Sequence, residues 1–212
     1  MVRILYLHGF ASSPHSRKAA FFKEQLDRQG IAVCAPDLAG GDFRNLTLTR
    51  QLETVEREAG GESVFLIGSS MGGYLAALYA ARHPEVAGLI LLAPAFRFRR
   101  RWAEVMGAED FAQWKETGEL MVYHYGVNRE VPLGYQLMQD AETYEDFPDF
   151  GQPCLILHGT RDTVVPIQYS NDFAARHANV ELVRLQSGHE MTDVLEKIWV
   201  KAWPRLAQAK GR

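Results

Sequence analysis

Short runs of apolar residues alternate along this chain with longer stretches in which apolar positions recur every three or four residues. The first pattern is typical of buried strands, and the second is typical of helices that pack on a sheet. Six apolar runs are predicted to be strands: Arg3–Leu7, Ile31–Ala35, Val64–Ile67, Val86–Ala93, Cys154–Leu157 and Val180–Leu185. Helices are predicted between them, at about Pro14–Gln29, Thr47–Ala59, Ser70–Arg82 and Ile167–His177, and from about Thr192 onwards. This alternation predicts an α/β fold with a mainly parallel sheet of about six strands and helices on both faces.

One stretch interrupts the alternation. More than fifty residues, from Ala95 to Gln152, separate the fourth and fifth predicted strands, and a connection of about that length usually has structure of its own. Its predicted elements are helical turns around the pairs Trp102 with Met106 and Phe111 with Trp114, a strand over Leu120–Tyr125, and a helix from Pro132 to about Glu142. We expect residues 95–152 to form a lid or cap insertion above the sheet.

Length and composition fit one domain spanning residues 1–212, because 212 residues with 47% hydrophobic content suffice for a substantial core. The net charge is −3 and both signs are scattered, which argues against a nucleic-acid partner. No apolar run is long enough to span a membrane. The chain begins with a strand in place of an apolar leader, and its two cysteines, Cys34 and Cys154, lie in predicted strands. These features predict a cytoplasmic location.

The run Val64–Ile67 leads directly into Gly68-Ser69-Ser70-Met71-Gly72, and good helix formers follow. A G-x-S-x-G pattern between a buried strand and a helix is typical of a nucleophile elbow, in which the central serine projects above the sheet. The small residues Gly68 and Gly72 let the two backbones pass each other. Ser70 is therefore the candidate nucleophile, although the same five residues can also form an ordinary turn.

A serine nucleophile needs a general base that is oriented by an acid. Asp162 follows the fifth predicted strand and His189 follows the sixth, so both lie at the carboxyl ends of strands, where α/β sheets bind ligands. Ser, Asp and His also occur in the chain order expected of an α/β-hydrolase triad. Glu190 and Asp193 remain alternative acids because they are close to His189 in the sequence.

Together with His8-Gly9-Phe10 after the first strand, these motifs resemble those of the α/β-hydrolase superfamily, over most of that fold. The segment Leu7–Pro14 resembles the small bacterial YqiA-like esterases and thioesterases, and the region Asp162–His189 resembles the acyl-protein thioesterase and acyl-glucuronide esterase branch. The opening antiparallel hairpin of the superfamily is absent, so the sheet is expected to lack those two strands. The resemblance implies an oxyanion hole formed by the amides of Phe10 and Met71.

The resemblance implies a serine hydrolase that cleaves small carboxylic esters or thioesters through an acyl-enzyme on Ser70. An acyltransferase or perhydrolase would use the same triad, and a non-catalytic binding module on the same scaffold is a third reading. Candidate substrate-binding residues, which could equally pack the lid onto the sheet, are Trp102, Met106, Tyr125 and Val164.

A basic run in the long stretch forms either a solvated edge or a site for an anionic substrate; it comprises Arg97, Arg99, Arg100 and Arg101. No metal or organic cofactor is expected. The sequence has no His/Cys cluster with ligand spacing, and no G-x-G-x-x-G follows the first strand.

Overall fold

In the computed structural model, which describes residues 2–210, the apolar runs form one sheet of six strands. These strands are β1 (Arg3–Leu7), β2 (Val33–Cys34), β3 (Val64–Ser69), β4 (Gly88–Leu92), β7 (Cys154–Gly159) and β8 (Val180–Leu185). Their order across the sheet is β2-β1-β3-β4-β7-β8, and every neighbouring pair is parallel. The predicted parallel sheet is confirmed, and no antiparallel strand joins it within the described residues.

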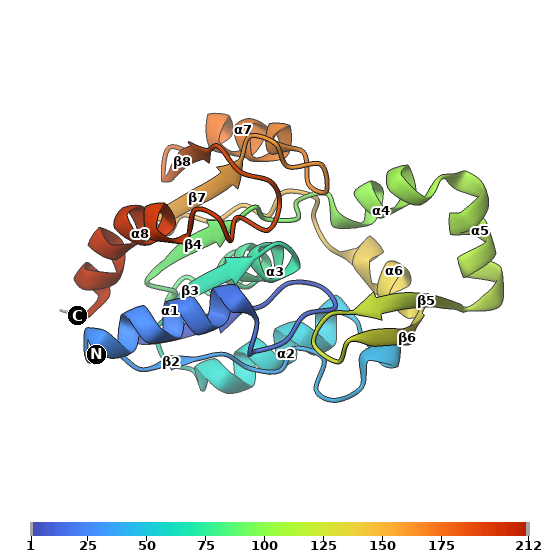
Figure 1. Ribbon diagram of the computed structural model, residues 1–212, viewed down its shortest axis with the longest axis horizontal. Coiled ribbons are helices and arrows are strands. Elements are labelled where there is room, and N and C mark those ends of the chain that lie inside the picture. Colours follow the sequence, from blue (N-terminus) through green and yellow to red (C-terminus); the bar gives the residue numbers. More distant parts are fainter. Residues whose placement is uncertain (1, 211–212) are drawn as a thin grey trace.

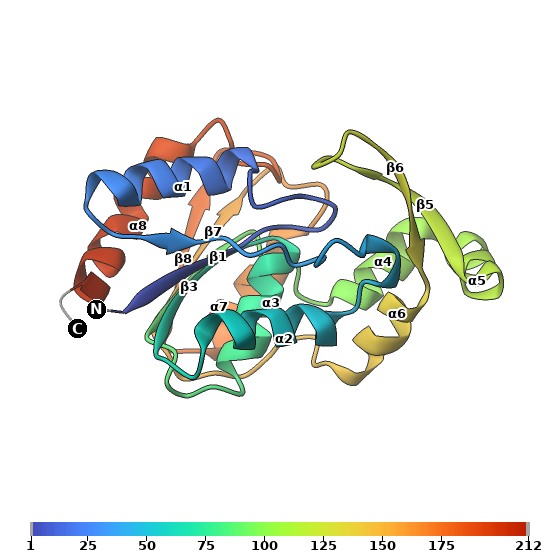
Figure 2. The ribbon, with the colours of Figure 1, turned by 90° about the horizontal axis from the view of Figure 1, so that it is seen from below.

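Helices cover both faces of this sheet, as Figures 1 and 2 show. One face is covered by α1 (Arg17–Arg28) and α8 (Leu195–Lys210), and the other by α2 (Leu48–Ala59), α3 (Met71–Ala80) and α7 (Ile167–Arg176). Successive side chains of a strand point to opposite faces. Ile67 therefore packs in one core cluster with Phe22 of α1, whereas Leu66 packs in the other with Leu75 of α3.

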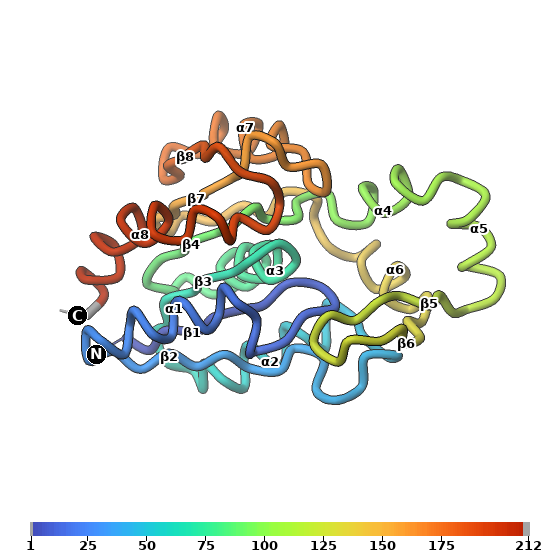
Figure 3. Tube along the Cα trace, in the orientation of Figure 1, coloured from blue at the N-terminus to red at the C-terminus, as the bar shows by residue number. Residues whose placement is uncertain are grey.

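The chain between β4 and β7, here called the β4–β7 segment (residues 95–152), has its own elements. It contains α4 (Phe98–Met106), α5 (Ala108–Thr117), β5 (Glu119–His124), β6 (Arg129–Gly134), α6 (Gln136–Asp140) and the 3-10 turn η2 (Ala141–Thr143). The Cα trace leaves the sheet after β4, runs outward through α4 and α5, and returns through β5, β6 and α6 (Figure 3). The segment thus occupies the end of the molecule opposite both chain termini (Figure 1).

One element of the β4–β7 segment differs from its prediction. The expected strand over Leu120–Tyr125 is present as β5, but the expected helix from Pro132 is wrong. Pro132 lies inside β6, opposite Met121 of β5, and the following helix is confined to Gln136–Asp140. In a two-stranded pair each strand has one unpaired edge, where the missing N–H of a proline costs no ladder bond.

Candidate active site

Ser70 lies in a sharp turn between β3 and α3, with φ 53° and ψ −117°. The two flanking glycines make this turn possible. A Cβ on Gly68 would lie 2.3 Å from the carbonyl oxygen of Gly72, and a Cβ on Gly72 would lie 2.1 Å from that of Leu7. The start of α3 therefore passes the backbones of β3 and of the end of β1 at distances that exclude side chains, and Ser70 occupies a strained conformation.

His189, in the loop after β8, connects Ser70 to Asp162, in the loop after β7. The His189 Nε2 atom lies 3.0 Å from Ser70 Oγ, and Nδ1 lies 2.7 Å from Asp162 Oδ2. The Asp162 side chain is fully buried and that of His189 is 13% exposed. A carboxylate beside Nδ1 keeps the proton on that nitrogen, so Nε2 is left to accept the proton of the serine hydroxyl.

Both oxygens of the Asp162 carboxylate accept hydrogen bonds. Oδ1 accepts from the backbone N–H groups of Val164 and Val165, each at 2.9 Å. Oδ2 accepts from His189 and also lies 3.2 Å from Nε2 of His158. Burial by itself would raise the pKa of Asp162, but the bonds from His158 and His189 outweigh it and hold this pKa well below its usual value. Asp162 is therefore a carboxylate across the working pH range of ordinary proteins.

His158 is a buried partner of this site that the motifs did not place against Asp162. It is fully buried at the end of β7, with Nε2 3.0 Å from the carbonyl oxygen of Val165 and Nδ1 2.8 Å from Oγ of Ser170. Because Nε2 faces two acceptors, it carries the proton, and Nδ1 accepts from the Ser170 hydroxyl. The four-residue spacing between His158 and Asp162 was the only sequence signal for this contact.

The alternative acids face other groups. The hydroxyl of Ser187 donates to Asp193, and Glu190 lies 3.7 Å from Nζ of Lys18. Asp162 is therefore the carboxylate that the structure brings to Nδ1 of His189.

A largely apolar cavity of about 260 Å³ opens beside Ser70. It is lined by Phe10, Ser70, Met71, Ala95, Phe96, Phe98, Arg101, Trp102, Val105, Met106, Val164 and Val165. The structure thus brings together with Ser70 both residues of the expected oxyanion hole and three of the four candidate substrate-binding residues. The wall belongs partly to α4 of the β4–β7 segment and partly to the loop after β7.

Trp102 has two roles in this wall, because it lines the cavity and also packs against other rings. Its ring centroid lies 5.2 Å from that of Phe10 and 5.5 Å from that of Trp114. Tyr125 lies elsewhere: the residue is 72% exposed, and it is not among those that line the cavity. Its backbone N–H donates to the carbonyl oxygen of Ala11, so the β5–β6 hairpin contacts the loop that follows β1.

All four arginines of the basic run have a carboxylate nearby, and Arg101 shares Glu104 with Arg97, at 3.8 Å from its Nη1. Arg97 lies 3.7 Å from Glu104, Arg100 lies 2.6 Å from Asp146, and Arg99 pairs with Glu142. These pairs neutralise the charge that an anionic substrate would need, which favours the solvated-edge reading for Arg97, Arg99 and Arg100. Arg101 differs, because it lines the cavity and donates to backbone carbonyls.

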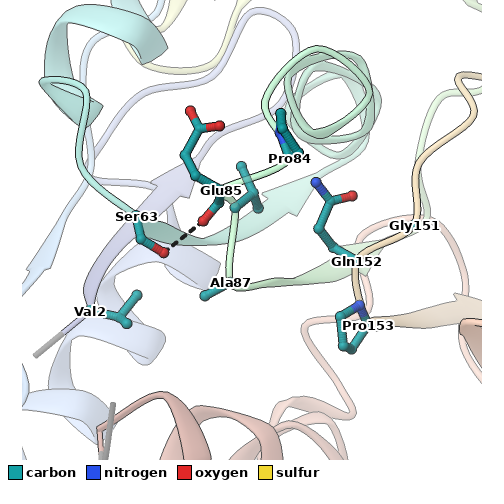
Figure 4. Close-up of a pocket in the computed structure, with 9 residues that line it drawn as sticks. Val2, Ser63, Pro84, Glu85, Ala87, Gly151, Gln152 and Pro153 are labelled. Carbon is teal, nitrogen blue, oxygen red and sulfur yellow. Dashed lines mark hydrogen bonds between the residues drawn. The ribbon is translucent and has the colours of Figure 1, made fainter.

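A second and larger depression, of about 580 Å³, lies at the end of the sheet opposite to Ser70, where the strands β1, β3, β4 and β7 begin (Figure 4). Its serine, Ser63, donates to the carbonyl oxygen of Glu85 at 2.7 Å. No histidine occurs among the nine residues that line this depression, so Ser63 has no imidazole beside it as Ser70 has in His189.

Within residues 2–210, no group of three or more His, Cys, Asp or Glu side chains is arranged to hold a metal ion. In the same residues, no helix combines the length and the apolar character that crossing a bilayer requires.

Comparison with known proteins identifies the class to which this fold belongs. Alpha/beta hydrolase domain-containing protein 10 from mouse superposes with a TM-score of 0.81 at 22% identity, covering 97% of this chain and 89% of the mouse chain. The AB hydrolase superfamily protein YisY of Bacillus subtilis is 26% identical in an alignment that covers 88% of this chain and 84% of YisY. The fold is therefore that of an α/β hydrolase.

Within that class, the chain belongs to the uncharacterised protein family UPF0227, whose model matches residues 3–202. A more local similarity links it to the thermostable monoacylglycerol lipase of Bacillus sp. strain H-257, which is 31% identical over 99 residues. That match covers 42% of this chain and 39% of the lipase, so the chain spans well under half of the lipase's length.

Proposed function

We propose that the protein is a serine hydrolase that cleaves small carboxylic esters or thioesters. The observation that carries this proposal is the hydrogen-bonded chain from Ser70 Oγ through His189 to Asp162, with contacts of 3.0 and 2.7 Å. The local similarity to a monoacylglycerol lipase supports an ester substrate.

In the proposed reaction, Oγ of Ser70 attacks the substrate carbonyl while Nε2 of His189 takes the hydroxyl proton. Asp162 stabilises the resulting imidazolium through Nδ1. His189 then returns the proton to the leaving alcohol or thiol, and the acyl group stays on Ser70 as an ester. Water attacks this acyl-enzyme with His189 again acting as base, which releases a carboxylic acid and restores the serine.

Backbone amides are proposed to stabilise the tetrahedral oxyanion. Phe10 and Met71 line the same cavity as Ser70, from the loop after β1 and from the first residue of α3. A helix N-terminus favours negative charge at that position, and each lost oxyanion donor typically costs a factor of about 10² to 10³ in kcat.

The cavity supports a short or medium acyl chain, or an aryl group, as the substrate part that binds beside Ser70. Its wall is built from Phe98, Trp102, Met106 and Val164, which offer apolar surface to such a group. We propose that the β4–β7 segment is a lid on a single hydrolase domain, because it supplies seven of the twelve residues that line the cavity, five of them on α4. The two free cysteines fit the cytoplasm as the expected compartment.

The test is hydrolysis of a panel of p-nitrophenyl esters and acyl thioesters of increasing acyl length. We expect wild-type protein to turn over at least one member of the panel and Ser70→Ala to lose about 10³-fold or more in kcat, as triad variants do. Ser69→Ala is the matched control, because the adjacent serine is buried in β3. Hydrolysis that persists in Ser70→Ala would refute the proposal.

A fluorophosphonate that labels Ser70 provides the second measurement. Labelling with no hydrolysis of any ester, together with transfer of the acyl group to an added alcohol or to peroxide, would assign an acyltransferase or perhydrolase. If the fluorophosphonate does not label Ser70, the protein is better described as a non-catalytic binding module.

A further inference from the structure

Arg101 projects from α4 onto the loop that carries Asp162. Its Nε donates to the carbonyl oxygen of Val164 at 2.9 Å, and its Nη2 donates to that of Thr163 at 3.1 Å. The carboxylate of Glu104 is more distant, at 3.8 Å from Nη1, and does not compete for these two donors. The fork of one guanidinium thus holds two successive carbonyl groups of the loop.

These carbonyls belong to the peptide groups that join residue 163 to 164 and residue 164 to 165. The N–H groups of the same two peptides, those of Val164 and Val165, donate to Oδ1 of Asp162 at 2.9 Å each. In a trans peptide the C=O and N–H bonds point in opposite directions. Each peptide therefore accepts from the guanidinium on one side and donates to the carboxylate on the other.

Hydrogen bonds arranged in series polarise one another, and a charged donor at one end strengthens the whole series. The cation of Arg101 therefore makes both N–H groups better donors to Asp162, and its rigid fork fixes the loop in which they lie.

We propose that Arg101 is a positioning residue that holds Asp162 in place through these two peptide groups and so couples the cavity wall to the triad. This inference rests on the proposed function, because it concerns the acid of that triad. Arg101, Val164 and Val165 also line the cavity, so the contact that supports Asp162 forms part of the proposed acyl-binding wall.

A double-mutant cycle tests the coupling. We expect Arg101→Met to slow fluorophosphonate labelling of Ser70 about tenfold in the otherwise wild-type chain, since bonds to a charged group are lost. In the Asp162→Asn background, where no carboxylate is left to hold, Arg101→Met should change the labelling rate less than about twofold. Equal slowing in both backgrounds would overturn the inference.

Ester kinetics distinguish a positioning role of Arg101 from a role in which its side chain only lines the cavity. A positioning role lowers kcat to the same extent for p-nitrophenyl acetate and octanoate. An increase in KM confined to octanoate, with kcat unchanged, would mean that Arg101 only shapes the wall, and the inference would be wrong. Arg101→Lys keeps the positive charge but lacks the two parallel donors of the guanidinium. It is measured in the same double-mutant cycle, so that a folding defect of the Met variant does not decide the result. Arg100→Met, on the same helix and paired with Asp146, is the control and should match wild type.

A measurement without substrate distinguishes failure of this inference from failure of the proposed function. The low-field proton resonance of His189 Nδ1–H reports the bond to Asp162 whether or not the protein is active. We expect Arg101→Met to shift or broaden this resonance and Arg100→Met to leave it in place. An unchanged resonance in Arg101→Met would overturn the inference, whereas persistent hydrolysis by Ser70→Ala would overturn the proposed function alone.

Discussion

The two carboxylate oxygens of Asp162 are held from different directions, Oδ1 by loop amides and Oδ2 by two histidines. On the second side, the Ser170 hydroxyl donates to Nδ1 of His158 and so fixes the ring tautomer that presents N–H to Asp162. Ser170 is fully buried on α7 and does not itself touch the triad. It is expected to act on the acid only through His158.

Ser170→Ala tests this chain of bonds. Loss of the hydroxyl leaves Nδ1 of His158 buried without a donor, which should cost about 1–3 kcal/mol in the free energy of unfolding. The ring can then take the other tautomer, so we also expect kcat to fall while KM stays close to wild type. Urea unfolding and ester kinetics on the same sample measure both effects.

Thr54→Ala is the matched control, since this mostly buried hydroxyl also lies on a helix but donates to the Arg50 carbonyl, far from the site in the fold. It should alter stability with kcat unchanged. A Ser170→Ala variant that loses stability and keeps full kcat would show that the His158 contact has no bearing on Asp162.

The sequence predicted the residues that stand at strand ends better than those that depend on the long segment. Ser70, Asp162 and His189 each follow a strand whose position in a parallel sheet is set by its apolar pattern, so their meeting at one edge was predictable. The placement of Arg101 and Tyr125 depends on how residues 95–152 fold back on the sheet. Periodicity within that segment carries no information about its contacts elsewhere.

At the scale of elements, the junction between β3 and α3 depends on close backbone contact. Ala at position 72 would place its Cβ 2.1 Å from the Leu7 carbonyl oxygen and 2.5 Å from that of His8, and both are main-chain atoms. Backbone cannot move aside as a flexible side chain can. We therefore expect Gly72→Ala to lower the free energy of unfolding by about 1–3 kcal/mol, the usual cost of overpacking.

Thermal unfolding and fluorophosphonate labelling of Ser70 measure the effect of Gly72→Ala. Gly151→Ala serves as the control, because no atom lies within 4 Å of a Cβ built there, and it should behave like wild type. Normal stability and labelling in Gly72→Ala would show that the turn at Ser70 does not need this close approach.

Among the elements, the strands of the main sheet were predicted more reliably than those of the β4–β7 segment. Strands buried on both faces, such as β3 and β4, appear as unbroken apolar runs that few other structures produce. The strand β6 carries no such run, and its Pro132 is a residue type that is enriched at the start of helices. It pairs with β5 across the short turn at residues 125–128, and no apolar run marks that pairing.

At the scale of the whole molecule, buried histidines make stability depend on pH. His8 is almost completely buried, with Nδ1 2.9 Å from the Gly9 carbonyl oxygen and Nε2 accepting from the Leu38 N–H. Burial lowers the pKa of His8 below its usual value, and burial does the same to the pKa of His124. Below about pH 6.5 the unfolded chain binds protons that the folded chain does not, so the free energy of unfolding should fall as the pH falls.

Urea unfolding at pH 8, 7, 6 and 5 measures this dependence. Replacing His8 with Gln removes one of the two groups, so the fall in stability between pH 7 and pH 5 should be smaller than in wild type and should not vanish. The exposed His15, replaced in the same way, is the control for the loss of an imidazole as such. A His8→Gln variant with the full wild-type dependence would mean that His8 is not kept neutral by the fold.

The contact of Arg101 with the loop after β7 is made entirely to main-chain oxygens of Thr163 and Val164. The side chains at these two positions therefore take no part in it, and that of Val164 lies at the mouth of the cavity, 53% exposed. On the proposed function, we expect replacement of Val164 to alter which acyl groups fit without loosening the support of Asp162. Evolution or protein engineering could then change the proposed substrate preference at position 164 independently of catalytic rate.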